Sequence, residues 1–282
     1  MYRARKVLKE SVQYFKRPDI YGLEFIEATF VTHRFARHVH DYYALGVIET
    51  GVQTFYARGE QHITPSGGVF LLNPGEPHDG EAAITSGFTY RTFYPTTEML
   101  QKLAEEITGK PQPLPFFSPL IVQDNALTQA LLQLHACLKS PGSTLEGEEK
   151  LLEVFDLLLT RYADRRVQAQ PRGQERQAVR LIRDYLQSCY DQNPSLAELA
   201  RLVSFSPYYL ARVFQAEVGL PPHAYLESVR VRQAQRLLSE GQAISQVAQA
   251  VGFADQSHFH HRFKRLIGLT PRQYAQQRKI LQ

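Results

Sequence analysis

Two hydrophobic patterns divide the chain, and the first covers residues 20–95. Here apolar and aromatic residues form short runs separated by Gly- and Pro-rich turns, without a helical period. Such runs predict β-strands, which we expect at Leu23–Thr32, His38–Glu49, Gly51–Ala57, Gln61–Thr64, Val69–Leu72 and Phe88–Tyr94. Because the turns are closely spaced, the pattern favours a sandwich or barrel, and we predict a small β-barrel.

The second pattern is helical and begins near Thr97. Apolar residues recur there at intervals of three or four, which predicts a helix that stops at Gly109. After a Pro-rich connector at residues 110–119, we expect two amphipathic helices, over Ala126–Lys139 and Glu146–Ala163. One interpretation of their apolar faces is that both helices pack against the barrel.

A polar segment follows these helices. Residues 164–177 contain Pro171 and Gly173 but no periodic apolar residues, which is typical of a linker. A chain of 282 residues is long enough for two domains. We therefore predict a first domain over residues 1–164, a linker over residues 165–175 and a second domain over residues 176–282.

The second domain contains an internal repeat. Two residues of its first unit recur 48 residues later: Ala200 as Ala248 and Phe205 as Phe253. Four further positions recur 49 residues later: Phe214, Gly219, Pro222 and Tyr225 as Phe263, Gly268, Pro271 and Tyr274. Each unit predicts a helix, a short turn, a second helix, a Gly stop and a helix that starts at Pro. The domain is therefore expected to hold two helix-turn-helix motifs.

The second helix of each unit has an outward polar face. Ser206 and Asp255 are expected to cap these two helices, and Gly252 can take the positive φ that ends the helix before Asp255. In the later helix a buried stripe is predicted at Phe259, Phe263 and Leu266, which leaves outward Ser257, His258, His261, Lys264 and Arg265. In the earlier helix the outward residues are Tyr208, Tyr209, Arg212 and Gln215.

The charge is distributed unevenly between the two halves. Residues 1–171 hold 17 Lys and Arg against 20 Asp and Glu, whereas residues 172–282 hold 15 against 8. This basic second half fits nucleic-acid binding, although it equally fits another anionic surface. No apolar run approaches the roughly 20 residues of a membrane helix, and no apolar segment follows the basic start, so a cytoplasmic protein is expected.

Three histidines mark the predicted barrel. His38 and His40 lie two residues apart on one expected strand face, and His78 follows a Pro-Gly turn. One interpretation is a small-molecule pocket lined by His38, His40, Tyr43 and His78. In a second, the histidines only make structural hydrogen bonds, and in a third they hold Zn or Fe. Arg91 is either a carboxylate-binding residue or a surface arginine.

The stretches RHVHDYYALGVIETG and LLNPGEPH, at residues 37–51 and 71–78, resemble the cupin barrel found at the N-terminus of AraC-type regulators. Metal-binding cupins carry a Glu three or four residues after the paired histidines, where this chain has Ala44 and Leu45. That departure argues against a metal, and we predict none. The resemblance also implies that the two helices after the barrel form an antiparallel dimer interface, as an alternative to packing on the barrel.

The run GFADQSHFHHRFKRLIGLTPRQY, at residues 252–274, resembles the C-terminal DNA-binding domain of the AraC/XylS family, as does the whole repeat. The resemblance implies that the residues entering the DNA major groove are Tyr208, Ala211 and Arg212 of the first motif and Gln256, Ser257, His258 and His261 of the second. His261 stands where the family usually has Arg, which weakens the expected guanine contact. Lys264, Arg265 and Arg230 are expected to contact phosphates.

These observations predict an α+β multidomain protein, with a cupin-like β-barrel and a helical dimerisation region followed by an all-α domain with two helix-turn-helix motifs. Its expected function is transcriptional regulation: it binds double-stranded promoter DNA as a homodimer, under the control of a small-molecule effector held in the barrel. An activator would also contact RNA polymerase, and the protein would be associated with the bacterial nucleoid. We expect no catalytic residue, no cofactor and no membrane partner.

Two alternatives remain open at this point. In one, the barrel is a cupin-type metalloenzyme that uses His38, His40 and His78, and the basic domain is an appended DNA-binding module. In the other, the protein binds DNA and its barrel only dimerises.

Overall fold

The computed structural model describes residues 9–140, 142–165 and 175–280. Its contacts divide the chain into two compact units, the first made of Met1–Lys139 and Lys150–Ala169, the second of Ser140–Glu149 and Gln170–Gln282. Apart from Arg165 and Glu175, the predicted linker lies outside the described residues. The first unit is rich in strands and the second is helical, as the sequence predicts.

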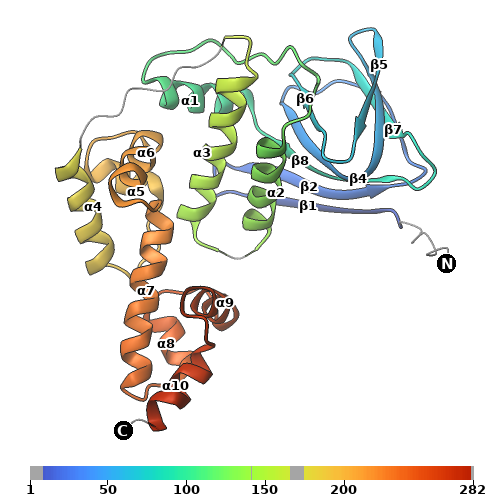
Figure 1. Cartoon of the computed structure of the whole chain (residues 1–282). Coiled ribbons are helices and arrows are strands. Elements are labelled where there is room, and N and C mark those ends of the chain that lie inside the picture. Colours follow the sequence, from blue (N-terminus) through green and yellow to red (C-terminus); the bar gives the residue numbers. More distant parts are fainter. Residues whose placement is uncertain (1–8, 141, 166–174, 281–282) are drawn as a thin grey trace. The chain divides into compact units, whose positions relative to one another are not determined.

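The described strands of the first unit are joined in one antiparallel sheet (Figure 1). They are β1 (Ser11–Arg17), β2 (Leu23–Phe30), β3 (Arg34–His38), β4 (Ala44–Ala57), β5 (Glu60–Pro65), β6 (Val69–Leu72), β7 (His78–Ala82), β8 (Phe88–Tyr94) and β9 (Ile121–Val122). The main path runs β1-β2-β8-β4-β6-β9, with β5 and β7 also paired to β4 and β3 paired to β7. Because the path ends at β1 and β9, the described strands form an open sheet and not a closed barrel.

Strand β4 is the centre of the sheet and differs most from the prediction. Two strands were expected, up to Glu49 and from Gly51, but the chain continues as one strand of 14 residues. Gly51 permits this, since its φ is 79° and a Cβ there would lie 2.1 Å from the carbonyl oxygen of Gly87. The predicted strand His38–Glu49 is wrong at its start, because β3 ends at His38 and β4 begins at Ala44. His40 therefore lies in the connection between them.

Three helices complete the first part of the chain: α1 (Thr97–Thr108), α2 (Asn125–Lys139) and α3 (Thr144–Arg161). Helix α1 ends as predicted at Gly109, which has the left-handed conformation. Helix α2 contacts β4 and β8. Its apolar stripe is buried, and so is the stripe of α3; the residues are Leu127, Leu131, Leu134, Leu138, Leu151, Phe155, Leu158 and Leu159. For α2, packing against the sheet is thus confirmed.

The second unit confirms the repeat. Its helices after α4 (Arg176–Ser188) come in matching sets, α5 (Leu196–Leu202), α6 (Pro207–Val218) and α7 (Pro222–Ser239), then α8 (Ile244–Ala250), α9 (Gln256–Ile267) and α10 (Pro271–Ile280). The start of α8 follows that of α5 by 48 residues, whereas α9 and α10 follow α6 and α7 by 49. The extra residue is therefore accommodated between α8 and α9.

The helix caps explain where these elements start and stop. Ser206 Oγ accepts a hydrogen bond from Tyr209 N at 3.1 Å, and Asp255 Oδ1 accepts one from His258 N at 2.7 Å. At the turn of the second motif, Gly252 has a φ of 83°, and a Cβ there would lie 2.5 Å from the carbonyl oxygen of Asp191. The matching position of the first motif, Ser204, also has a positive φ, 57°. Both motifs therefore turn through a left-handed residue, the second one in a space that only Gly fits.

Within the described residues, no helix is long and apolar enough to cross a membrane.

Candidate ligand pocket and DNA-recognition surface

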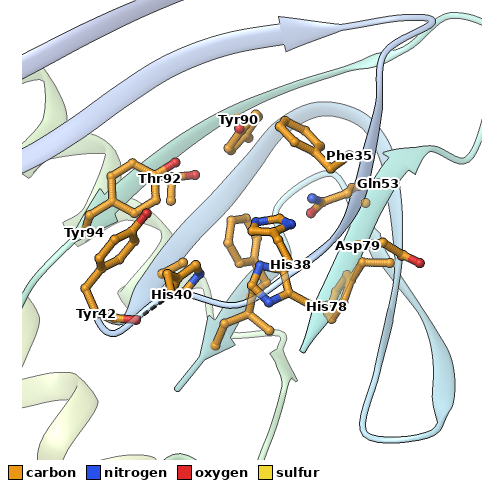
Figure 2. Close-up of a pocket in the computed structure, with 15 residues that line it drawn as sticks. Phe35, His38, His40, Tyr42, Gln53, His78, Asp79, Tyr90, Thr92 and Tyr94 are labelled. Atoms are coloured by element: carbon orange, nitrogen blue, oxygen red, sulfur yellow. Dashed lines mark hydrogen bonds between the residues drawn. The ribbon is translucent and has the colours of Figure 1, made fainter. Parts of the chain in front are cut away.

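The sheet of the first unit lines a pocket of about 110 Å³ (Figure 2). Its wall is largely aromatic and polar; the lining residues are Phe35, His38, His40, Tyr42, Ala44, Gln53, Phe55, Phe70, Leu72, His78, Asp79, Gly80, Tyr90, Thr92 and Tyr94. Figure 2 shows the rings of His38, His40 and His78 gathered together, with Tyr90, Thr92 and Tyr94 across the pocket from His78. The structure thus brings the three predicted histidines into one pocket.

The histidines come from different places in the fold. His38 ends β3 and pairs in register with His78, the first residue of β7. Their ring centroids are 4.5 Å apart, and those of His40 and His78 are 4.9 Å apart. His78 is buried, whereas His38 is exposed at the rim. Together they line one end of the cavity.

Burial lowers the pKa of His40 and of His78, and the charge of a neighbouring imidazolium ring lowers both further. Both rings are therefore neutral near pH 7. Among the described residues, no group of three or more His, Cys, Asp or Glu side chains is arranged to hold a metal ion.

Two residues predicted for the pocket lie elsewhere. Tyr43 is fully buried beside Phe117, and its hydroxyl donates to the carbonyl oxygen of Pro115 at 2.5 Å. Its neighbour Tyr42 lines the cavity instead. Alternation of side chains from His38 and His40 places Tyr42 and not Tyr43 on their face, so the choice of Tyr43 did not follow the strand pattern.

Arg91 also lies outside the pocket. Its guanidinium forms salt bridges with Glu27 at 3.0 Å and Glu49 at 2.7 Å, on the strands next to β8. Because side chains alternate along a strand, Arg91 lies on the face opposite that of Tyr90 and Thr92. Because Glu27 and Glu49 hold its guanidinium on that face, Arg91 does not contact a ligand in the cavity.

The sequence did not single out several polar residues of the wall. Gln53, Tyr90, Thr92 and Tyr94 reach the cavity from β4 and β8. The alternation along β8 could have indicated them, since Tyr90, Thr92 and Tyr94 are spaced two apart. Gln53 gave no such signal, because its strand was cut at Gly51.

In the second unit, the start of α9 carries an exposed polar surface. Gln256, Ser257, His260 and His261 surround a hollow of about 260 Å³, and each is exposed. Three of these were predicted to contact DNA, whereas His260 was missed. The repeat contained the signal, because His260 follows Ala211 by 49 residues. Lys264 and Arg265 continue the exposed face one turn further along α9.

Two residues of α9 differ in burial from the prediction. His258 is half-buried, its ring 5.5 Å from that of Phe253, and its Nε2 accepts from Arg262 Nε at 3.1 Å. Burial lowers the pKa of His258, with a further contribution from Arg262. Leu266, predicted to be buried, is 45% exposed.

On α6 the outward face is narrower than predicted. Gln215 is exposed, and Ala211, Arg212 and Tyr209 are partly buried. Tyr208 is only 4% exposed, and the Arg212 guanidinium lies 5.2 Å from its ring centre. The prediction of an outward Tyr208 is therefore wrong. Its physical cause is that α6 contacts α4, α5 and α7, so that more than one side of the helix is covered.

The basic residues also differ in their environment. Arg230 is 4% exposed and donates from Nε to the carbonyl oxygen of Tyr190 at 2.7 Å. A side chain so enclosed does not reach a phosphate, so this expectation is wrong for Arg230. Arg265 is exposed, with a salt bridge from its Nη2 to Glu227 Oε2 at 2.7 Å.

Comparisons with known proteins agree with this architecture. A family profile described as "AraC-like ligand binding domain" matches residues 20–155, and one described as "Helix-turn-helix domain" matches residues 199–277. The chain is 32% identical over 229 residues, 81% of its length, to the uncharacterized HTH-type transcriptional regulator YbfI of Bacillus subtilis, covering 82% of that protein. It is 25% identical over 252 residues to the HTH-type transcriptional activator RhaS of Pectobacterium carotovorum, with 86% and 88% of the two chains covered.

A solved structure is also similar. The C-terminal domain of AraT, a response regulator from Geobacillus stearothermophilus, matches with 31% identity, a TM-score of 0.35, and coverage of 36% of this chain and 84% of that one.

The fold and the matched domains define a DNA-binding transcriptional regulator with a ligand-binding domain. The chain belongs to the AraC family of transcriptional regulators. These findings favour a regulator over the alternative of a cupin-type enzyme.

Proposed function

We propose that this regulator recognises two successive DNA major grooves with α6 and α9 and that a small effector in the pocket of the first unit controls this binding. The observation that carries the proposal is the pair of matching helix-turn-helix motifs, joined by α7. At about 1.5 Å per residue, the 18 residues of α7 span roughly 27 Å, close to the ~34 Å that separates successive major grooves.

The proposed base contacts are the exposed or partly exposed polar residues of the two helices: Arg212 and Gln215 on α6, and Gln256, Ser257, His260 and His261 on α9. Arginine and glutamine match donor and acceptor patterns of base edges, and serine and histidine supply weaker contacts. Lys264 and Arg265 are proposed phosphate partners. Ala211, Tyr209 and the half-buried His258 are proposed to shape the surface next to these residues.

The effector part of the proposal rests on the cavity between β4, β7 and β8. Pockets with an aromatic wall and a few convergent polar groups are typical of small-molecule sites. An effector acts by binding one arrangement of the protein more tightly than another, which changes the population that is competent for DNA. Tyr42, Gln53, Tyr90 and Thr92 join the three histidines as proposed ligand contacts.

The proposal also covers the oligomeric state, the contact with RNA polymerase and the cellular location. A homodimer is supported by the way regulators of this kind bind paired half-sites. A contact with RNA polymerase applies if the protein is an activator, like the RhaS relative named as one. A DNA partner and the basic second half of the chain support a location in the cytoplasm at the nucleoid.

The proposal is tested by mapping the genomic sites that the full chain binds and then measuring affinity in vitro for one mapped site. We expect binding to that site at least a thousandfold tighter than to a scrambled sequence of equal composition, in line with the range of roughly 10³–10⁷ for specific over non-specific binding. Equal affinity for both sequences would refute sequence-specific recognition. The control is Arg34→Ala, which changes an exposed residue of the first unit and leaves both affinities unchanged.

A further inference from the structure

One turn of α3 belongs to the second unit and carries three carboxylates. By its contacts, the segment Ser140–Glu149 lies in the same compact unit as the helix-turn-helix motifs, although the ligand-binding profile over residues 20–155 includes it. Glu146 is 7% exposed, and Glu148 and Glu149 are each 8% exposed. We call these three residues the acidic turn. A buried carboxylate is costly unless it is paired, so the partners of the acidic turn show what it does.

Two of the carboxylates bind the starts of helices. Glu148 Oε2 accepts a hydrogen bond at 2.5 Å from the main-chain N of Leu196, the first residue of α5. Glu149 accepts from the main-chain N of His223 at 3.0 Å and from its Nδ1 at 2.6 Å. His223 is the second residue of α7, whose N-cap, Pro221, makes no side-chain hydrogen bond. The acidic turn therefore satisfies main-chain donors at the starts of α5 and α7.

The third carboxylate contacts the second motif. Glu146 Oε2 accepts a hydrogen bond at 2.5 Å from Nη2 of Arg262, which belongs to α9. On its other side, Arg262 Nε lies 2.9 Å from Glu227 Oε1 of α7. The Arg262 side chain is thus held between two carboxylates and is 17% exposed. Because Arg262 directly follows His261, a proposed base contact, its ion pairs fix the part of α9 that would enter the groove.

The acidic turn joins the two motifs to each other. Helices α5 and α6 make most of their contacts with each other, α4 and α7, whereas α8 and α9 make most of theirs with each other, α7 and α10. Helix α7 and the side chain of Arg230 also connect these two groups. The acidic turn adds a connection from the start of α5 to α9 itself, one residue from a proposed base contact.

The chemistry of this contact favours orientation over stability. Burial raises the pKa of Glu149, the hydrogen bonds from His223 oppose the rise, and the charge of Glu146 adds to it. Burial also raises the pKa of Glu227, while the charge of Arg262 opposes that rise. Buried ion pairs contribute little net stability compared with apolar packing, but their hydrogen bonds are satisfied in one geometry only. The contact therefore selects a single arrangement of the two motifs.

We propose that the acidic turn is a positioning element for DNA recognition, which holds α9 in one orientation relative to the first motif. Its residues do not contact DNA themselves. The proposal rests on the proposed function, in which α6 and α9 enter successive major grooves. A unit that is already in its bound arrangement loses less conformational entropy on binding, so the acidic turn strengthens binding to a site with the matching spacing. Without it, the second motif moves more freely about α7.

The first test measures how affinity depends on spacing. The full chain is titrated with a mapped genomic site and with the same site carrying one extra base pair between the two tracts. The insertion displaces one tract by about 3.4 Å and turns it by roughly 35°. We expect it to raise Kd roughly tenfold or more for the wild type and roughly threefold or less for the double variant Glu146→Ala/Glu149→Ala. The double variant also binds the original site more weakly, although it has lost two negative charges.

Glu153→Ala is the matched control. Glu153 is exposed on the same helix, so its variant loses the same charge and keeps the insertion penalty of the wild type. Glu146→Gln is the milder variant, because the amide oxygen still accepts from Arg262 while the charge is removed, and we expect an intermediate penalty. An unchanged penalty in Glu146→Gln and in the double variant would overturn the proposal. So would tighter binding of the original site by both, because the acidic turn would then act on DNA through its charge.

The second test observes the two motifs without DNA. Spin labels are attached at Ala216→Cys on α6 and Gln249→Cys on α8, both exposed, in a full chain in which Cys137 and Cys189 are replaced by Ala. Double electron-electron resonance then measures the distribution of distances between the labels. We expect this distribution to become roughly twice as wide when Glu146→Ala and Glu149→Ala are added. Equal widths with and without the acidic turn would contradict a positioning role.

The two tests separate this proposal from the proposed function. If each bound wild-type chain protects two tracts but the double variant keeps the insertion penalty, recognition of two grooves stands and the positioning role fails. If each wild-type chain protects a single tract, recognition of two grooves fails, and the label distances alone decide whether the acidic turn orients the motifs.

Discussion

The guanidinium of Arg230 lies 5.7 Å from the centre of the Phe253 ring, which places a buried cation of α7 against the turn of the second helix-turn-helix motif. The same side chain donates to the carbonyl oxygens of Tyr190 and Gln192 at 2.7 and 2.5 Å and to Asn193 Oδ1 at 3.0 Å. Arg230 thus joins the loop before α5 to α7 and to the second motif.

We predict that Arg230→Met destabilises the protein by roughly 2–4 kcal/mol, since it removes three hydrogen bonds that the buried guanidinium donates to the loop before α5. Urea denaturation of the full chain, followed by circular dichroism, measures this. Lys264→Met is the control, because Lys264 is exposed and its loss leaves stability within about 0.5 kcal/mol. Unchanged stability in Arg230→Met would show that these hydrogen bonds contribute little.

Arg212 and Lys264 are predicted to affect DNA binding differently. Arg212→Ala lowers affinity for the bound site by about 1–3 kcal/mol and relaxes preference at one base pair, because a base contact is lost. Lys264→Ala weakens all sequences alike and reduces the salt slope by about one, as expected for a phosphate contact. Fluorescence anisotropy at several salt concentrations distinguishes the two. The assignment of Arg212 to the groove is wrong if its variant loses the same factor on every sequence.

Tyr43 is predicted to stabilise the fold without contacting the effector. Tyr43→Phe leaves the buried carbonyl oxygen of Pro115 unpaired, at a cost of about 1–3 kcal/mol. Tyr42→Phe, by contrast, is expected to change the affinity of the pocket for its effector more than stability, since Tyr42 lines the pocket and is 36% exposed. Calorimetric unfolding measures stability, and titration with a compound that stabilises the wild-type chain in a thermal-shift screen measures affinity. Equal effects of the two variants on the affinity for that compound would contradict this division of roles.

His135 is predicted to make stability depend on pH. Burial, with a contribution from Arg91, lowers its pKa to about 4, and its ring packs edge-on against Phe25 at 5.2 Å. The folded state keeps His135 neutral where the unfolded state binds a proton near pH 6.5. The free energy of unfolding therefore falls as pH decreases from about 6.5 to about 4, by at most roughly 3 kcal/mol from this residue.

The variant His135→Leu checks this assignment. Because leucine does not titrate, the decrease in the free energy of unfolding between pH 6.5 and pH 4 becomes smaller than in the wild type. Denaturation curves at four pH values in this window suffice. An unchanged pH dependence would show that another group is responsible.

The helical half of the protein could be predicted closely because its signals are local. Caps such as Ser206 and Asp255 and stops such as Gly219 and Gly268 act within one helical turn, and the structure places each where the sequence does. The apolar period of each helix also required no knowledge of its neighbours.

The errors have a common physical origin, which is tertiary contact. Nothing near Arg230 in the sequence shows that carbonyl groups some 40 residues earlier surround it. Tyr208 faces away from Leu210 on a helical wheel, yet it is only 4% exposed and the Arg212 guanidinium lies over its ring. Strand β7, with the sequence HDGEA, has no apolar pattern and forms only by pairing with β3 and β4.

Only part of the pocket could be predicted, because the rest depends on tertiary contacts. His38, His40 and His78 were found because two of them are close in sequence and the third follows a turn. Gln53 and Thr92 were not, since their role depends on the register that brings Gly46 opposite Thr92 and extends β4 past Gly51.

We propose that one chain recognises two successive major grooves of the DNA. Hydroxyl-radical footprinting of the full chain on a mapped site tests it most directly. For each bound chain we expect two protected tracts about 10 base pairs apart on one face of the duplex, with Arg212→Ala weakening one tract and His261→Ala the other. A single protected tract for each chain would contradict this proposal. So would an equal loss of protection at both tracts in each variant.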